Sequence, residues 1–79
     1  MDDKLRLTPV ASLQVPLGGQ QIELQQVDFV HGGISLLRVR IREGRRFTVF
    51  DIDPGSAAAW GAAMLRWANQ QPAGADSPQ

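Results

Sequence analysis

Residues 37–42 (LRVRIR) alternate strictly between apolar and basic side chains, and this period of two constrains the fold more than any other feature of the sequence. Successive side chains of a β-strand point to opposite faces of its sheet. One face then carries Leu37, Val39 and Ile41, and the other carries Arg38, Arg40 and Arg42. The pattern predicts a half-buried strand with one basic face.

Glycine-rich turns divide the rest of the chain into further strands. Gly18-Gly19, residues 31–33 (HGG) and Gly44 mark the turns, because glycine readily adopts the positive φ that tight turns require. The predicted strands are residues 12–17, 20–30, 34–41 and 46–52. Pro9 has no amide donor, so a loose or edge segment is expected over residues 1–11.

The second of these strands changes face along its length. Ile22 and Leu24 share one face, whereas Val27 and Phe29 fall on the other. One extra residue near 25–26 would return all four to the same side, so we predict a β-bulge there. The alternative is a strand that is buried on both faces at one end.

The turn at Gly44 decides which residues of the fourth strand join the arginines. A type I turn over residues 41–44, with Gly44 as a bulge residue, fits the spacing. A two-residue loop at 43–44 would instead turn Phe47 and Val49 to the arginine side. We predict the first register because it buries more apolar side chains; its cross-strand pairs are Val39–Phe47, Leu37–Val49, Arg40–Arg46 and Leu36–Phe50.

A helix is predicted over residues 55–71. Asp53 is a strong N-cap candidate and Pro54 suits the first helical turn, while Ser56 is the alternative cap. Gly61 suggests a close approach to the sheet. One stripe at helical spacing is predicted to pack on the sheet, and it comprises Trp60, Ala63, Met64, Trp67 and Ala68.

These elements predict an α+β fold, a four-stranded antiparallel β-meander with one C-terminal amphipathic helix packed on one face (ββββα). A single domain is expected over residues 12–71, preceded by the loose segment at 1–11 and followed by a disordered tail at 72–79. The predicted core comprises Leu37, Val39, Ile41, Phe47, Val49, Trp60, Met64 and Trp67.

Size and charge limit the classes of function. Eight basic and eight acidic residues cancel, so no global attraction to nucleic acid or to an anionic membrane is expected. The chain has 79 residues and no cysteine, which excludes disulfides and thiolate metal sites. A chain this small then forms a compact monomer or a dimer, and we expect a homodimer. An acidic start without a long apolar run predicts a cytoplasmic protein with no membrane segment.

The basic face is the candidate binding site. It would hold phosphates on its guanidiniums and stack a base on its aromatic ring, and its residues are Arg38, Arg40, Arg46 and Phe50. The competing interpretation, which we prefer, is a solvated face whose arginines pair across strands with Glu23, Asp28 or Asp51.

The sequence offers little support for a catalytic, metal-binding or nucleotide-binding site. Asp51 and Asp53 supply too few oxygen ligands for a metal ion, and His31 in its glycine-rich turn has no companion ligand or nucleophile motif. No phosphate-binding glycine fingerprint is present. We therefore predict no catalytic residue, no metal and no cofactor, and expect that the protein is not an enzyme.

Residues 36–67 (LLRVRIREGRRFTVFDIDPGSAAAWGAAMLRW) resemble the shared block of a group of short bacterial proteins of unknown function. Four strands followed by a helix are also similar to the PUR-type repeat and to Whirly-like domains. That likeness implies a curved sheet that binds single-stranded nucleic acid, with the four site residues above on its binding side.

Two hypotheses follow for the function. The first is a non-enzymatic interaction or assembly module, which contacts another protein or a second copy of itself. The alternative is a single-stranded nucleic-acid-binding protein that uses the arginine-rich face. The first is preferred because the chain is neutral.

Overall fold

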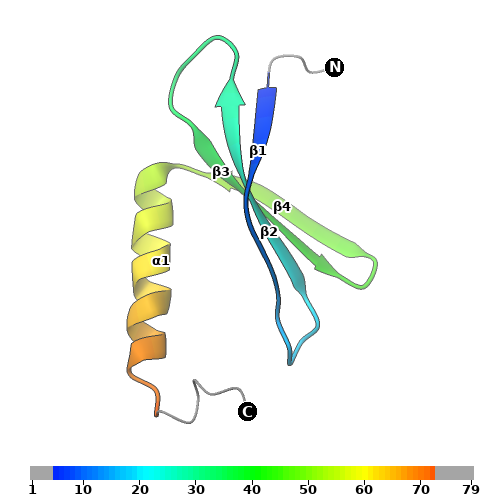
Figure 1. Cartoon of the computed structure of the whole chain (residues 1–79), viewed down its shortest axis with the longest axis vertical. Coiled ribbons are helices and arrows are strands. Elements are labelled where there is room, and N and C mark those ends of the chain that lie inside the picture. Colours follow the sequence, from blue (N-terminus) through cyan, green and yellow to red (C-terminus); the bar gives the residue numbers. More distant parts are fainter. Residues whose placement is uncertain (1–4, 73–79) are drawn as a thin grey trace.

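The computed structural model describes residues 5–72 and shows one four-stranded antiparallel sheet followed by one helix (Figure 1). The strands follow one another across the sheet in chain order, β1-β2-β3-β4. The elements are β1 (Leu5–Gln14), β2 (Gln21–Phe29), β3 (Leu36–Glu43), β4 (Arg46–Ile52) and α1 (Pro54–Asn69). The predicted ββββα meander is confirmed.

The first strand begins earlier than predicted. Residues 5–11 belong to β1, which pairs with β2 from Leu5–Phe29 to Gln14–Gln21, so the expectation of a loose segment there is wrong. Pro9 is accommodated because β1 is an edge strand, where a missing amide donor need not interrupt a ladder. Residues 1–4 of that segment, and residues 73–79 of the predicted tail, lie outside the described residues.

The sheet contains a bulge, but it lies in β1 rather than in β2. The β1–β2 register shifts between Pro9 and Ala11, which makes Val10 the extra residue. The β2–β3 pairing runs without a shift from Gln21–Arg42 to Val27–Leu36. The apolar side chains of β2 therefore do change from one face of the sheet to the other along the strand. This agrees with the alternative prediction, which needed no bulge in this strand.

The hairpin at Gly44 has a different register from the one predicted. Glu43 pairs with Arg46, which leaves a loop of two residues, Gly44 and Arg45. Gly44 has a φ of 62° whereas Arg45 has a negative φ, the combination found in a type II′ turn with glycine first. The observed pairs are Leu37–Ile52, Arg38–Asp51, Val39–Phe50, Arg40–Val49, Ile41–Thr48 and Arg42–Phe47.

This register turns every side chain of β4 to the face opposite the one predicted. We call the side of the sheet that carries Arg38, Arg40 and Arg42 the arginine face, and the side that carries Val39 and Phe50 the helix face. The arginine face also holds Gln21, Glu23, Phe47, Val49 and Asp51. The predicted register is wrong because a tight primed turn, whose twist matches the strands, takes Gly44 as its first residue.

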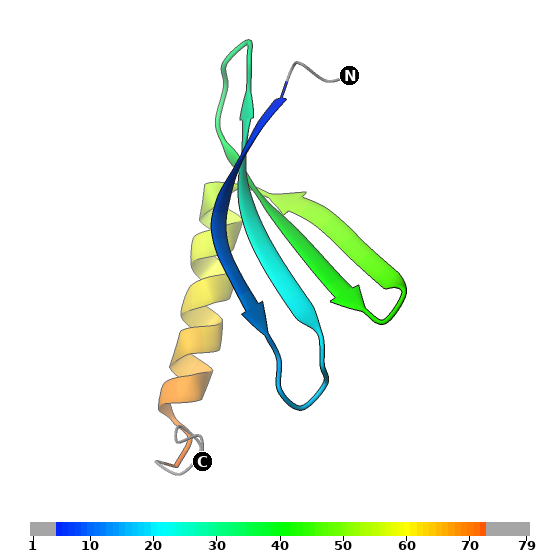
Figure 2. The same ribbon diagram turned by 45° about the vertical axis from the view of Figure 1, so that its right-hand side comes forward.

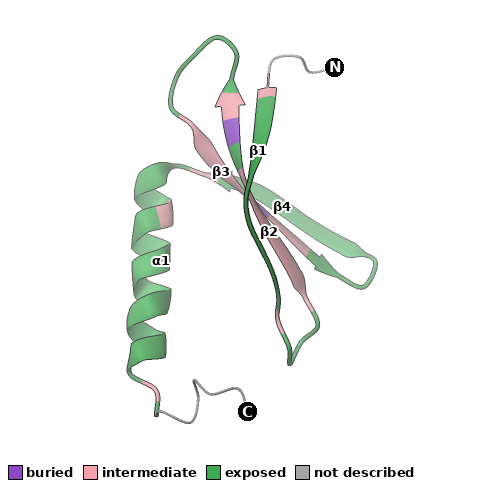
Figure 3. Cartoon of the chain, viewed as in Figure 1, coloured by how far each residue is buried: buried purple, intermediate pink, exposed green. Residues whose placement is uncertain are grey.

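Only two side chains of the described chain are buried (Figure 3). The strand pairing places them on opposite faces of the sheet. Val39 is 3 % exposed, in a row across the helix face between Leu24 and Phe50. Val27 is fully buried in a row across the arginine face, between Leu7 and Leu36. The sheet therefore has two small apolar clusters instead of one core.

The helix begins at a well-defined cap. The Asp53 carboxylate accepts hydrogen bonds from the Ser56 amide at 3.1 Å and from the Ser56 hydroxyl at 2.6 Å, and Pro54 occupies the first helical turn. The two serine bonds, the hydroxyl first, lower the pKa of Asp53 below its ordinary value. The predicted cap at Asp53 is confirmed.

Beyond its start the helix lies mostly clear of the sheet (Figure 1). The ring of Trp60 lies 6.1 Å from that of Phe50, centroid to centroid, and no residue of α1 is buried. The predicted core residues Phe47, Val49, Trp60, Met64 and Trp67 are all exposed. The radius of gyration, 15.2 Å, exceeds the value of about 12 Å expected for a compact domain of this length.

Substitutions at two glycines, Gly44 in the turn and Gly61 in the exposed helix, should change the free energy of unfolding in opposite directions. We expect Gly44→Ala to lower the free energy of unfolding by about 1–2 kcal/mol, because alanine is strained at positive φ. Gly61→Ala should raise it by roughly 0.5–1 kcal/mol, since a Cβ at Gly61 meets nothing within 4 Å and alanine favours helix. Denaturant unfolding at one fixed protein concentration measures both. A destabilised Gly61→Ala would show that the helix packs more closely than described.

Candidate interaction surface

The arginine of β3 nearest its beginning is paired with a carboxylate of β4. Arg38 and Asp51 are direct cross-strand neighbours. Arg38 Nε donates to Asp51 Oδ1 at 2.8 Å, and Arg38 Nη2 donates to Oδ2 at 3.1 Å. This bidentate arrangement lowers the pKa of Asp51 and raises that of Arg38, in both cases chiefly through the hydrogen bond between them.

The next arginine has two neighbours on the same face. Arg40 Nη1 donates to Glu23 Oε1 at 3.0 Å, across the β2–β3 ladder. Its guanidinium carbon lies 5.3 Å from the centroid of the Phe47 ring, within the range of a cation–π contact. The charge of Arg40 is thus balanced by a carboxylate of the same chain.

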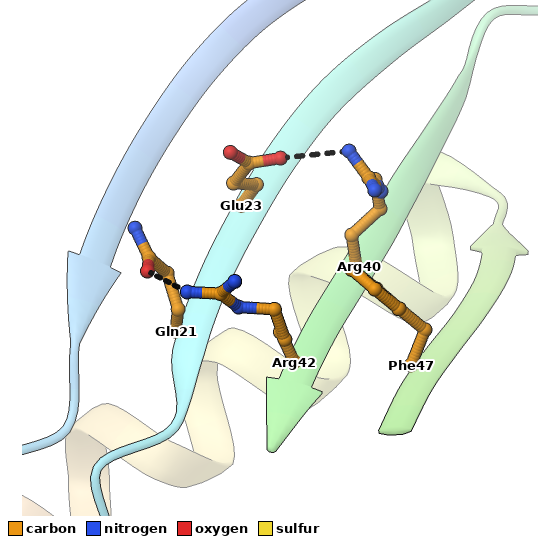
Figure 4. A pocket seen from close by; sticks show the side chains of 5 residues that line it. All are labelled: Gln21, Glu23, Arg40, Arg42 and Phe47. Carbon is orange, nitrogen blue, oxygen red and sulfur yellow. Dashed lines mark hydrogen bonds and ion pairs between the residues drawn. The ribbon is translucent and has the colours of Figure 1, made fainter. Parts of the chain in front are cut away.

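A shallow pocket of about 280 Å³ lies beside this pair (Figure 4). Arg42 Nη2 donates to Gln21 Oε1 at 3.4 Å on one side, and the Arg40–Glu23 pair lies on the other. Phe47 completes the lining. An anion entering the pocket meets the Glu23 carboxylate as well as the two guanidiniums, which weakens its attraction.

The four predicted site residues do not form one surface. Arg38 and Arg40 lie on the arginine face, as expected. Arg46 is paired with Glu43 and Phe50 with Val39, which places both side chains on the helix face. This separation follows directly from the register at Gly44, on which the predicted patch depended.

Asp28 was a candidate partner for the arginines, but it has other neighbours. Its carboxylate accepts a hydrogen bond from the Ser35 hydroxyl. The side-chain nitrogen Nε2 of Gln26 donates to both of its oxygens at 3.0 Å. Ser35 and then Gln26 lower the pKa of Asp28. Asp28 therefore connects the end of β2 to Ser35, the residue that precedes β3, through a hydrogen bond.

Residues 5–72 contain no cluster of three histidine, aspartate or glutamate side chains that could hold a metal ion. Asp53 caps α1. His31 lies in the turn between β2 and β3, where Gly32 and Gly33 have φ angles of 94° and 104°. No helix in this part of the chain is long and apolar enough to cross a membrane.

The stripe along α1, which was predicted to belong to the core, is an uncovered apolar surface. Trp60, Met64 and Trp67 are 45 %, 52 % and 65 % exposed. With Ala63 and Ala68 they line an open groove of about 490 Å³. The spacing of the stripe is readable in the sequence, but its exposure depends on the direction in which α1 leaves β4.

A family model described as a family of unknown function (DUF6967) matches residues 4–70, which include all four strands and the helix. The chain belongs to this family. No curated protein and no solved structure matches the chain. The expected membership of a family of unknown function is confirmed.

The Arg38–Asp51 pair makes stability depend on pH. The folded pKa of Asp51 lies below its ordinary value of 3.8, so the pair stabilises fully above the unfolded pKa and loses its effect as pH falls through the folded pKa. We expect Asp51→Asn to lower the free energy of unfolding by about 0.5–1 kcal/mol near neutral pH, and by much less at about pH 2.

A double-mutant cycle isolates the interaction. In an Arg38→Gln background, Asp51→Asn should cost clearly less than it does alone, because its partner is already absent. Chemical unfolding of the four chains at both pH values measures this. Equal costs in both backgrounds would mean that the pair contributes nothing to the folded state.

Proposed function

We propose that this protein is a non-enzymatic assembly module whose copies associate through the stripe of α1 and the helix face of the sheet. One observation supports the proposal above others: Trp60, Met64 and Trp67 are displayed on a helix that buries none of its own residues. Large uncovered apolar surfaces on a folded protein mark places where something else binds.

The energetics favour covering this stripe. A tryptophan buries about 150–250 Å² when fully covered, so the exposed parts of Trp60, Met64 and Trp67 amount to roughly 300–400 Å². Removing that area from water contributes several kcal/mol at about 25 cal/mol per Å². Among residues 5–72 only two side chains are buried, so this part of the isolated chain has little other apolar stabilisation.

A second copy is the proposed partner because one chain carries both halves of the contact. The helix supplies the stripe, and the sheet supplies an uncovered apolar surface with Leu13 and Phe50 exposed on the helix face. In a two-fold dimer each helix can lie on the sheet of the other copy, so the contact is made twice. Zero net charge removes long-range repulsion between copies.

The arginine face offers less support for the alternative of single-stranded nucleic-acid binding. Arg38 and Arg40 are engaged by Asp51 and Glu23, and phosphates would have to compete with these carboxylates. Phe50, the proposed stacking platform, lies on the other face. No feature of the geometry favours this function over self-association.

Met64→Glu tests the proposed contact. A glutamate in the middle of the stripe would bury a charge in the interface, so we expect a lower association state and at least a tenfold weaker association constant. Light scattering after size exclusion, with sedimentation over a range of concentrations, measures both.

Ala62→Glu is the matched control, because it adds the same charge in the same helix on the side opposite the stripe. It should leave the association unchanged. A wild-type chain that runs as a single copy at every concentration would overturn the proposal. Equal weakening by both variants would mean that the added charge acts without regard to the stripe.

A further inference from the structure

The two edges of the sheet are not alike. The edge at β1 is interrupted by Pro9 and by the bulge at Val10, two features that prevent an edge from pairing with another strand. The edge at β4 has seven residues, no proline and no register shift against β3. The edge at β1 is therefore protected against pairing with a further strand, whereas the edge at β4 is regular and open to pairing.

The turn at Gly44 determines which backbone groups point outward from β4. Residues that flank a two-residue hairpin loop form a hydrogen-bonded pair, and the pairs then alternate along the ladder. The backbone groups of Arg46, Thr48 and Phe50 therefore face β3. Those of Phe47, Val49 and Asp51 face away from it, and β4 has no further strand beside it within residues 5–72.

We propose that β4 pairs antiparallel with β4 of a second copy about a two-fold axis at Val49, so that two four-stranded sheets join into one. In this register Val49 lies opposite Val49 of the other copy and Phe47 lies opposite Asp51. All the outward groups of these residues are then used, in about six hydrogen bonds. The axis is normal to the sheet, so each face continues across the junction.

Charge complementarity favours the same strand as the occupant of this edge. The residues around the beginning of β4 are basic, with Arg45 in the turn and Arg46 in the strand, and those around its end are acidic, with Asp51 in the strand and Asp53 just after it. The antiparallel register brings Arg45 of one copy beside Asp53 of the other. A parallel arrangement would place like charges together, so the edge selects an antiparallel copy of itself.

Side chains at the junction also gain cover. Phe47 and Val49 are 56 % and 50 % exposed on the arginine face, beside the axis. Cross-strand neighbours lie about 4.5–5.5 Å apart between Cβ atoms, so the two Val49 side chains come into contact. Phe47 and Val49 thus lie where the junction would shield them.

The edge contact uses the outward backbone groups of β4, whereas the helix contact uses the stripe of α1 and side chains of the helix face. Figures 1 and 2 both place the β3–β4 hairpin on the side of the molecule away from the body of α1. The inference rests on the proposed self-association and adds a second interface to it. Two different two-fold contacts on one chain, when both close, produce an assembly of four copies.

Val49→Lys tests the edge. It places two ammonium groups against each other at the axis, so we expect the mass of the wild-type assembly to be halved. Val49→Pro, which removes the outward amide without touching the β3 ladder, should do the same. Leu7→Lys is the control, since Leu7 is similarly exposed on the same face of the other edge strand. It should leave the mass unchanged.

The exchange rates of backbone amides, measured by NMR, test the edge pairing residue by residue, and the wild-type protein alone already gives an informative pattern. In the wild-type assembly the outward amides of Phe47, Val49 and Asp51 should exchange at least ten times more slowly than in Val49→Lys. The inward amides of Thr48 and Phe50 should stay protected in both, which shows that the hairpin is intact. Should Val49→Lys not fold, the wild-type exchange pattern alone decides the question.

The outcomes separate this inference from the proposed function. A wild-type chain that stays a single copy overturns both. A wild-type assembly whose mass is unchanged by Val49→Lys, or whose outward amides on β4 exchange rapidly, overturns the edge pairing and leaves association through the helix standing.

Discussion

The two-residue turn at Gly44 is the constraint on which most of this structure depends. It pairs Glu43 with Arg46 and so fixes the register of β4 against β3. That register places Asp51 beside Arg38 and Phe50 beside Trp60. It also leaves the backbone groups of Val49 pointing away from β3. A slip by one residue would exchange the two faces of β4 and undo each of these relations together.

The architecture could be predicted from the sequence because it depends on local signals. Period-two alternation, paired glycines and the Asp53-Pro54 cap each act within a few residues, and they indicated four strands and a helix. The register could not be predicted, since the preferred pairing assumed that Phe47 and Val49 must be buried. Both remain exposed, so the assumed driving force was absent from the isolated chain.

The prediction that the four candidate residues share one face was wrong for the same reason, whereas the interpretation as a solvated face with cross-strand ion pairs is confirmed for two of its pairs. Cross-strand pairing of arginines with Glu23 and Asp51 was one of the two interpretations, and the structure shows both pairs. What no local pattern could reveal was the path of α1 after β4. That path buries no residue of α1, and it leaves Trp60 and Trp67 uncovered.

The internal pairing of the arginines bears on how copies could approach each other. In the joined sheet, Arg40 of one copy and Arg40 of the other are separated by three strand spacings, about 14 Å. Unpaired guanidiniums on the two sides would repel one another across the junction, by an amount that solvent and salt reduce at this distance. Because Glu23 and Asp51 neutralise Arg40 and Arg38 within each chain, little of that repulsion remains, and a surface that resembles a polyanion site becomes compatible with a continuous sheet.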